Sequence, residues 1–107
     1  MLSIRPEYAA RIFSGEKRFE FRRTTFKRPV DTVAVYVTAP VMRVVGEFDV
    51  EDILHMSVRR LWDHTRDHAG IDRRSFMNYF EGRSKGYALS IGQVRRYKEA
   101  LFLDEHF

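Results

Sequence analysis

The chain has 107 residues, of which 44% are hydrophobic and 14% aromatic, enough for one packed domain and too little for two. It contains no cysteine, which excludes a disulfide framework, a thiolate metal site and a cysteine nucleophile. Its formal net charge is +4, and no apolar run reaches the roughly 18 residues that span a bilayer, so we expect a cytoplasmic protein without a membrane segment.

The first predicted elements are a short apolar strand over residues 2–4 and a helix over about residues 6–14. Pro6 suits the first turn of a helix, where no backbone N–H is needed. Apolar residues recur at helical spacing up to Phe13, and Gly15 is typical of the position after a last helical turn. A second strand is predicted over residues 17–22.

Charged residues of both signs alternate with phenylalanines in this second strand, within the octet GEKRFEFR. Successive side chains of a strand point to opposite faces. If Phe19 and Phe21 face the core, the charged residues therefore gather on the other face. Lys17 joins them only if the strand begins with a kink. The expected ionic cluster comprises Arg18, Glu20 and Arg22.

The rest of the chain alternates irregularly between strands and short helices. Strands are predicted over residues 32–38, 41–50, 85–91 and 93–97, the last two on either side of Gly92. Helices are expected after Ser57 and after Asp72, because both side chains can cap a helix N-terminus. This order lacks βαβ alternation and predicts an α+β fold, a small mixed β-barrel of about five or six strands flanked by about three short helices.

The octet also carries a family resemblance. Gly15, Lys17, Glu20 and Arg22 match the pattern G-x-K-x-x-E-x-R, the signature of ASCH domains, which are small PUA-like barrels related to RNA-binding modules. The chain resembles one compact bacterial and archaeal branch of this family also in LSIRPEYA near its start and in YFEG and YALSI further on. The resemblance implies a single PUA-like ASCH domain over residues 1–107.

Basic residues are concentrated in residues 1–28, where eight lysines and arginines stand against three glutamates. Such asymmetry is typical of a surface that binds a polyanion, although a solvated basic surface is the plain alternative. The resemblance implies a cleft in which Lys17, Glu20 and Arg22 bind RNA or a modified nucleotide. Otherwise, Glu20 and Arg22 form a surface pair that contributes at most about 1 kcal/mol. The residues expected to contact the nucleic-acid backbone are Arg5, Arg18, Arg23, Lys27 and Arg28.

An enzymatic alternative follows from the same resemblance, since some ASCH relatives hydrolyse N4-acylated cytidine with a lysine, a threonine and a glutamate. Lys17 fills the first role, but Glu20 stands where the threonine is expected. The segment that should supply the glutamate reads RDHAG and contains none. Whether the chain is an enzyme, with Lys17 and Glu20 as catalytic residues, therefore stays open. The nearby side chains that could replace the missing groups are Thr24, Thr25, Asp63 and Asp67.

A second alternative is a non-catalytic protein-interaction module that uses the acidic strand around Glu47 to Glu51 or an exposed strand edge. His64 and His68 are four residues apart on a predicted helix and share a face there. Without a cysteine or an intervening glutamate, this spacing favours a solvated helix face over a metal site. We expect no metal and no cofactor.

Aromatic side chains could stack a nucleobase, as they often do in RNA-binding modules. Most of the tyrosines belong to apolar stripes and are assigned to the core. Trp62 and Phe26 remain as stacking candidates. We expect a monomer, and the sequence does not identify a protein partner.

Overall fold

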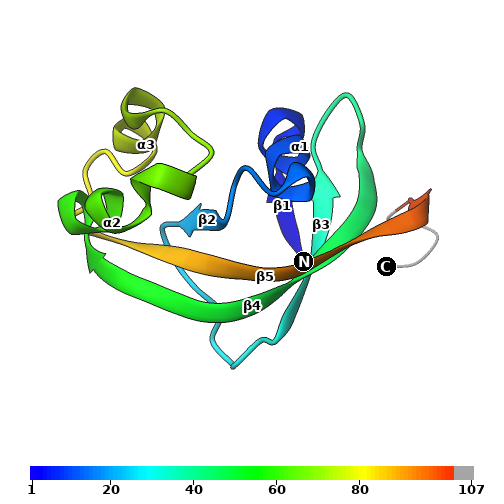
Figure 1. Cartoon of the computed structure of the whole chain (residues 1–107), viewed down its shortest axis with the longest axis horizontal. Helices are drawn as coiled ribbons and strands as arrows, with labels where there is room; N and C mark the ends of the chain where they lie inside the picture. The colour runs from blue at the N-terminus through cyan, green and yellow to red at the C-terminus, as the bar shows by residue number, and fades with distance from the viewer. Residues whose placement is uncertain (103–107) are drawn as a thin grey trace.

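The computed structural model describes residues 1–102, so the last five residues of the predicted domain lie outside the described residues. Five strands form one sheet in the order β1-β3-β4-β5-β2, and the helices cover one side of it (Figure 1). The elements are β1 (Leu2–Ile4), α1 (Pro6–Ser14), β2 (Phe19–Arg22), β3 (Thr32–Val37), β4 (Arg43–Ser57), α2 (Val58–Thr65), a 3₁₀ turn (Arg66–His68), α3 (Arg73–Tyr79) and β5 (Lys85–Leu101).

The sheet and its three helices confirm the predicted α+β fold. β1 and β2 form the two edges of the sheet, so it is open, a minor departure from the predicted barrel. β1 runs parallel to β3, and the other pairs are antiparallel. None of the helices within residues 1–102 has the length and apolar character that a membrane crossing needs.

The signals that predicted helix ends are confirmed. Pro6 opens α1, and Gly15 ends it with a φ of 87°, a left-handed conformation that glycine adopts without strain. The Ser57 hydroxyl accepts a hydrogen bond of 3.3 Å from the backbone N–H of Arg60. The Asp72 carboxylate accepts one of 2.8 Å from the N–H of Ser75. These capping bonds fix where α2 and α3 begin.

The two long strands differ from the prediction. β4 continues to Ser57 instead of ending at Val50, and β5 is one strand instead of two strands separated at Gly92. Gly92 does not break β5, because its missing side chain leaves room for the side chain of Glu51 on β4. Shifts of register on both sides of Val50 accommodate the bend of the ribbon without ending it.

Two hydrophobic clusters hold the layers together. The first packs α1 against the centre of the sheet and includes Ile12 and Phe48, which have no exposed surface. The second attaches α2 and α3 to β2, where the rings of Phe21 and Phe76 meet edge to face with centroids 4.9 Å apart. The second cluster holds α3 beside β2, and this arrangement forms the wall of the candidate site.

Candidate functional site

A pocket of about 460 Å³ lies between β1, α1, β2 and the α3 region. Its lining is mixed: four cationic side chains, one carboxylate, aromatic rings and small polar groups. The charged residues that line it are Arg5, Lys17, Glu20, Arg22 and Arg23. The aromatic and polar residues that line it are Ser3, Tyr8, Phe21, Ser75, Asn78 and Tyr79.

Lys17 lies in the turn between α1 and β2, because β2 begins only at Phe19. This is the kink that the sequence required for Lys17 to join the charged cluster. The side chain is buried, with 2% of the residue exposed. Its ammonium donates a hydrogen bond of 2.7 Å to the carbonyl oxygen of Ala69 and lies 4.7 Å from the ring centroid of Phe21. The ammonium of Lys17 is therefore fixed between a carbonyl and an aromatic face.

Glu20 is the acidic partner in the pocket and is also buried, with 7% of the residue exposed. One of its carboxylate oxygens lies 3.6 Å from Nη1 of Arg22, whose side chain is about one third exposed. Arg22 thus links the buried carboxylate to the mouth of the pocket. The prediction that Lys17, Glu20 and Arg22 lie together agrees with this geometry, whereas Arg18 lies outside the group.

Burial shifts the two inner charges toward their neutral forms. It lowers the pKa of Lys17 to about 8, against the opposing effect of Glu20. It raises the pKa of Glu20, although Lys17 and Arg22 act in the opposite direction. An amine with a pKa near 8 is present in both protonation states close to neutral pH. Lys17 can therefore serve as a hydrogen-bond donor or accept a proton.

The segment RDHAG, from which the resemblance implies a catalytic glutamate, contributes backbone carbonyls to the site. The Ala69 carbonyl holds Lys17, and the Gly70 carbonyl accepts a hydrogen bond of 2.9 Å from Nη1 of Arg11. Gly70 has a φ of 63°, and a β-carbon there would overlap the side chain of Lys17. Sequence reasoning missed this role because a backbone carbonyl leaves no residue-type signal, although the glycine in RDHAG marks the close approach.

Arg23 and Tyr79 form one rim of the pocket. Nε of Arg23 donates a hydrogen bond of 2.8 Å to the Tyr79 carbonyl, and the guanidinium lies 4.5 Å from the ring centroid. Tyr8 faces the interior, with its ring 5.4 Å from the Lys17 ammonium. The pocket thus offers cations for phosphate and aromatic rings for a base, which come from tyrosines that the sequence assigned to the core.

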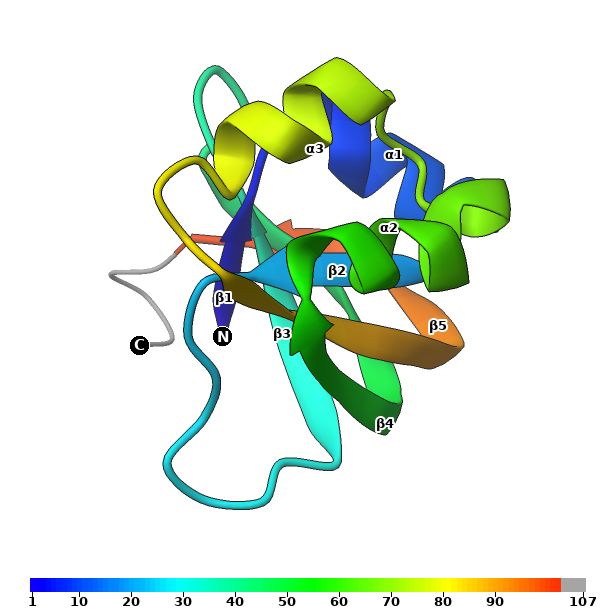
Figure 2. The same ribbon diagram turned by 90° about the vertical axis from the view of Figure 1, so that its left-hand side faces the viewer.

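Three predicted backbone contacts lie outside this pocket. Arg18 lines a separate hollow of about 140 Å³ beside Gly92. Lys27 and Arg28 are exposed in the connection between β2 and β3, which swings below the sheet and away from α3 (Figure 2). The five residues expected to contact the nucleic-acid backbone therefore lie on different parts of the surface. Only Arg5 and Arg23 line the pocket together with Lys17, Glu20 and Arg22.

The predicted stacking residues are used in packing. The Trp62 ring lies 5.0 Å from that of Phe76, and Phe26 packs against the first hydrophobic cluster. Neither residue lines the pocket. The residues considered as substitutes for the missing catalytic groups are also absent from the lining, namely Thr24, Thr25, Asp63 and Asp67.

His64 and His68 are both exposed, as a solvated face requires, but they do not lie on one α-helix as predicted. α2 ends at Thr65, so His64 belongs to the helix and His68 to the 3₁₀ turn that follows. Oγ1 of Thr65 donates a hydrogen bond of 2.8 Å to the Leu61 carbonyl at the helix end. Within the part of the chain that the structure describes, three or more potential metal ligands do not come together anywhere.

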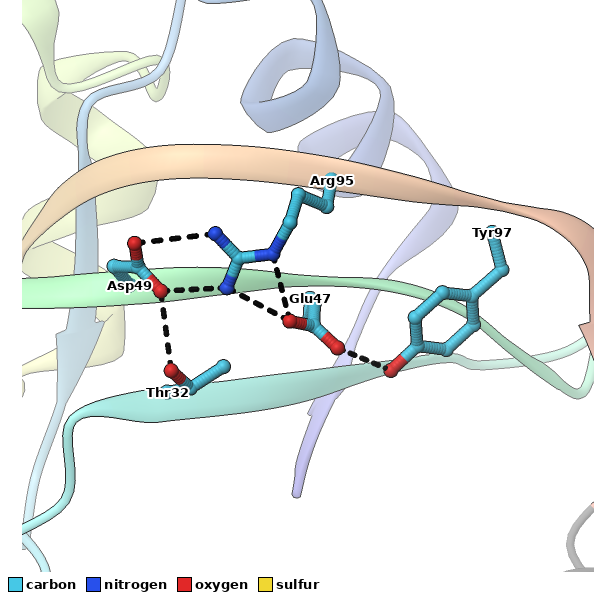
Figure 3. Close-up of polar contacts among 5 residues, drawn as sticks. All are labelled: Thr32, Glu47, Asp49, Arg95 and Tyr97. Carbon is cyan, nitrogen blue, oxygen red and sulfur yellow. Dashed lines mark hydrogen bonds and ion pairs between the residues drawn. The ribbon is translucent and has the colours of Figure 1, made fainter.

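Two carboxylates of the acidic strand are paired within the molecule (Figure 3). Arg95 on β5 contacts two carboxylates on β4, Glu47 at 2.7 Å and Asp49 at 2.6 Å. The hydroxyl of Tyr97 donates to Glu47 at 2.8 Å, and that of Thr32 donates to Asp49 at 3.0 Å. Arg95 thereby offsets part of the negative charge of this strand, and Glu51 and Asp52 form its exposed end.

The fold agrees with comparisons to known proteins. Residues 2–101 match the ASCH domain, and the chain belongs to that family. A region of the ATP synthase subunit alpha of Ureaplasma parvum serovar 3 is 37% identical over 92% of the chain, which spans 12% of that protein. The ASCH domain-containing ribonuclease of Zymomonas mobilis subsp. mobilis is 34% identical over 82% of the chain, which spans 60% of it.

The structural comparison agrees with this assignment. The crystal structure of ASCH from Zymomonas mobilis superposes with a TM-score of 0.89 at 30% identity. The alignment covers 97% of this chain and 73% of that one. The chain thus spans only part of the length of the relatives that it matches.

Proposed function

We propose that the pocket binds single-stranded RNA or a modified nucleotide. The observation that carries the proposal is that Lys17, Glu20 and Arg22 line one open pocket together with two further arginines. Burying a lysine and a glutamate is costly, and the pKa of each is shifted against its charged form. A stable fold does not require this buried pair, whereas a ligand with a phosphate and a polar base edge can interact with both charged groups.

The pocket residues fall into groups that suit different parts of a nucleotide. Arg5 and Arg23 lie at the mouth and are exposed, so they suit phosphate oxygens. Glu20 is an acceptor deep in the pocket and suits the exocyclic amine of a base. Tyr79 and Tyr8 offer ring faces, and a base stacked on an aromatic ring gains roughly 1–3 kcal/mol. The name of the Zymomonas mobilis relative, a ribonuclease, supports RNA as the ligand class.

Binding is tested by titrating a fluorescent hexanucleotide RNA with the protein at several salt concentrations. Three phosphate contacts predict a slope of about −2 for log affinity against log salt, from roughly −0.7 for each contact to a single strand. Arg22→Met lowers affinity and reduces the slope by about 0.7. Arg59→Met is the matched control, because Arg59 is exposed on α2 and does not line the pocket. Absence of binding at low salt, or binding indifferent to salt, contradicts the proposal.

RNA cleavage is a second candidate, favoured by the relative's name and by the pKa of about 8 for Lys17. In this reaction, neutral Lys17 removes the proton of a ribose 2′-hydroxyl, and the oxygen attacks the adjacent phosphorus. The bond from phosphorus to the 5′-oxygen breaks and a 2′,3′-cyclic phosphate forms. Glu20, whose raised pKa favours the protonated form, donates the proton to the leaving oxygen.

Cleavage is tested on a labelled RNA and on the same sequence with 2′-O-methyl riboses. The mechanism predicts cyclic phosphate ends from the first substrate only. Lys17→Met and Glu20→Gln each reduce the rate by roughly 100-fold or more, the usual contribution of a general base or acid. Cleavage of the methylated RNA, or an unchanged rate for Lys17→Met, rules the mechanism out.

Nucleoside deacylation and protein interaction have less support from the geometry. An N4-acylcytidine amidohydrolase needs a hydroxyl and a further acid beside Lys17, and the threonines and aspartates considered for these roles do not line the pocket. Incubation with N4-acetylcytidine, followed by chromatography, tests this activity directly. A protein-interaction role predicts partners that survive nuclease treatment in a pull-down, whereas an RNA-binding role predicts loss of the captured material.

A further inference from the structure

His55 and Tyr87 form a stacked pair that the pocket does not use. Their ring centroids are 4.1 Å apart, and the planes differ by only 8°. His55 is exposed and Tyr87 is half-buried. A stack of two flat rings at the surface provides an aromatic platform of the kind on which nucleobases stack.

This pair lies in line with the mouth of the pocket. Arg22 on β2 is directly opposite Tyr87 on β5, and Tyr87 is directly opposite His55 on β4. Directly opposed residues point to the same face of a sheet, so the three side chains form one row across three strands. Neighbouring strands are about 4.8 Å apart, which places His55 roughly 10 Å from Arg22.

The outer ring face of His55 is open because β4 is an edge strand at this point. β3 pairs with β4 only from Arg43 to Asp49, so among residues 1–102 no strand lies beside β4 on that side beyond Asp49 (Figure 1). Tyr87 covers the inner face of the imidazole, and the opposite face is left toward the edge. Ile53, two residues earlier on the same face, is also exposed and offers apolar surface beside the ring.

The charges around this platform suit an extended polyanion. Arg22 stands at one end of the row, and Lys85 precedes Tyr87 by two residues and shares its face. The exposed acids Glu51 and Asp52 lie further along β4 and end the favourable stretch. Arg22 and Lys85 thus place positive charge on two sides of Tyr87, and the acids lie further along β4.

We propose that the stack of His55 and Tyr87 is a second base-binding site, which holds the base of a neighbouring nucleotide when single-stranded RNA occupies the pocket. This inference rests on the proposed RNA-binding function and extends it to a ligand longer than one nucleotide. The pocket holds one nucleotide, the strand passes Arg22, and the next accessible base stacks on the outer face of His55.

The test compares ligands of different length on variants of the platform. The four ribonucleoside monophosphates probe the pocket alone, and the four homopolymeric hexanucleotides probe both sites. His55→Ala is expected to weaken hexanucleotide binding about 10-fold, within the range for loss of one stacked base, and to leave mononucleotide binding unchanged. His55→Phe keeps the ring and retains the affinity. His64→Ala is the matched control, an exposed histidine on α2 outside both sites.

A spectroscopic readout separates stacking from a change in fold. The imidazole protons of His55 are expected to shift upfield in the proton NMR spectrum with the hexanucleotide and to stay in place with the mononucleotides. Equal hexanucleotide affinity for His55→Ala and the unaltered protein overturns the second site, and so does an equal loss for both ligand lengths. Failure of the unaltered protein to bind any of these RNAs instead overturns the proposed function itself.

Discussion

The ammonium of Lys17 donates a hydrogen bond of 2.7 Å to the carbonyl oxygen of Ala69, a residue 52 positions further along the chain. This bond joins the turn after α1 to the segment between α2 and α3. It orients a buried cation with a backbone group, so its geometry depends on the chain path through Gly70. Small changes in the segment between α2 and α3 are therefore expected to disturb the position of the Lys17 ammonium in the pocket.

A Gly70→Ala substitution tests this coupling. The left-handed φ costs about 1–2 kcal/mol for alanine, and overlap with Lys17 adds roughly 1–3 kcal/mol. Gly82→Ala is the control, because Gly82 has a similar φ of 79° but its β-carbon would meet no atom within 4 Å. Urea unfolding is expected to show a larger loss of stability for Gly70→Ala, together with weakened RNA binding. Equal losses for the two variants contradict the coupling.

The buried ammonium predicts an alkaline rise in stability. The pKa of Lys17 is about 8 in the folded protein and 10.5 for an ordinary lysine, so the unfolded chain binds more protons between these pH values. Stability from this group therefore increases as the pH rises from about 8 to 10.5, by about 3 kcal/mol at most. The measurement is the unfolding free energy from pH 7 to 10.5, relative to Lys17→Met. A constant difference between the two proteins contradicts the low pKa.

RNA affinity is expected to fall over the lower part of that range. Loss of the Lys17 proton above about pH 8 removes one positive charge from the pocket. Hexanucleotide affinity measured at pH 7 and pH 9 should decrease for the unaltered protein and change less for Lys17→Met. Affinity that rises with pH would show that the charged form of Lys17 does not assist binding.

Several features of the fold were readable from the sequence because their causes are local. The strand predicted over residues 41–50 is found within β4, where Phe48 is buried and Glu47 half-buried, because strand periodicity depends only on neighbouring residues. The end of α1 at Gly15 and the cap at Asp72 follow from turn and capping chemistry. The continuity of β5 through Gly92 was missed because it depends on Glu51, which is distant in the sequence.

The site was predicted in part for the same reason. The alternation of side chains along a strand and the family pattern in GEKRFEFR predicted that Glu20 and Arg22 lie together. They did not reveal that packing of Phe21 against Phe76 buries this part of β2. Arg18 follows Lys17 directly but lines a different hollow. Tyr79, assigned to the core, lies at the pocket rim because tertiary packing decides which ring of an apolar stripe reaches the surface.

The contacts of Arg95 predict an acid-sensitive contribution to stability. Its hydrogen bonds lower the pKa of Asp49, and together with the Tyr97 hydroxyl they lower the pKa of Glu47. A depressed carboxyl pKa stabilises the folded state above the ordinary pKa, and this contribution is lost as the pH falls through the lower folded value. Arg95→Met is therefore expected to reduce the unfolding free energy at pH 7.

The difference between Arg95→Met and the unaltered protein should shrink below about pH 4, where carboxyl groups become protonated. Lys98→Met is the control, since Lys98 is exposed on the same strand and shows no contact with these acids. If acid changes the unfolding free energy of the two variants equally, the ion pairs of Arg95 make no acid-sensitive contribution to stability.

The location of bound RNA tests the central claim most directly. The measurement is an NMR titration of isotope-labelled protein with a hexanucleotide RNA, with backbone and side-chain signals followed for Lys17, Arg22 and Tyr79. The pocket predicts that the largest shift changes appear at these residues and that a higher RNA concentration is needed to produce them in Lys17→Met. Saturable binding whose largest changes lie elsewhere, with these signals unmoved, would contradict the assignment of the pocket as the RNA site.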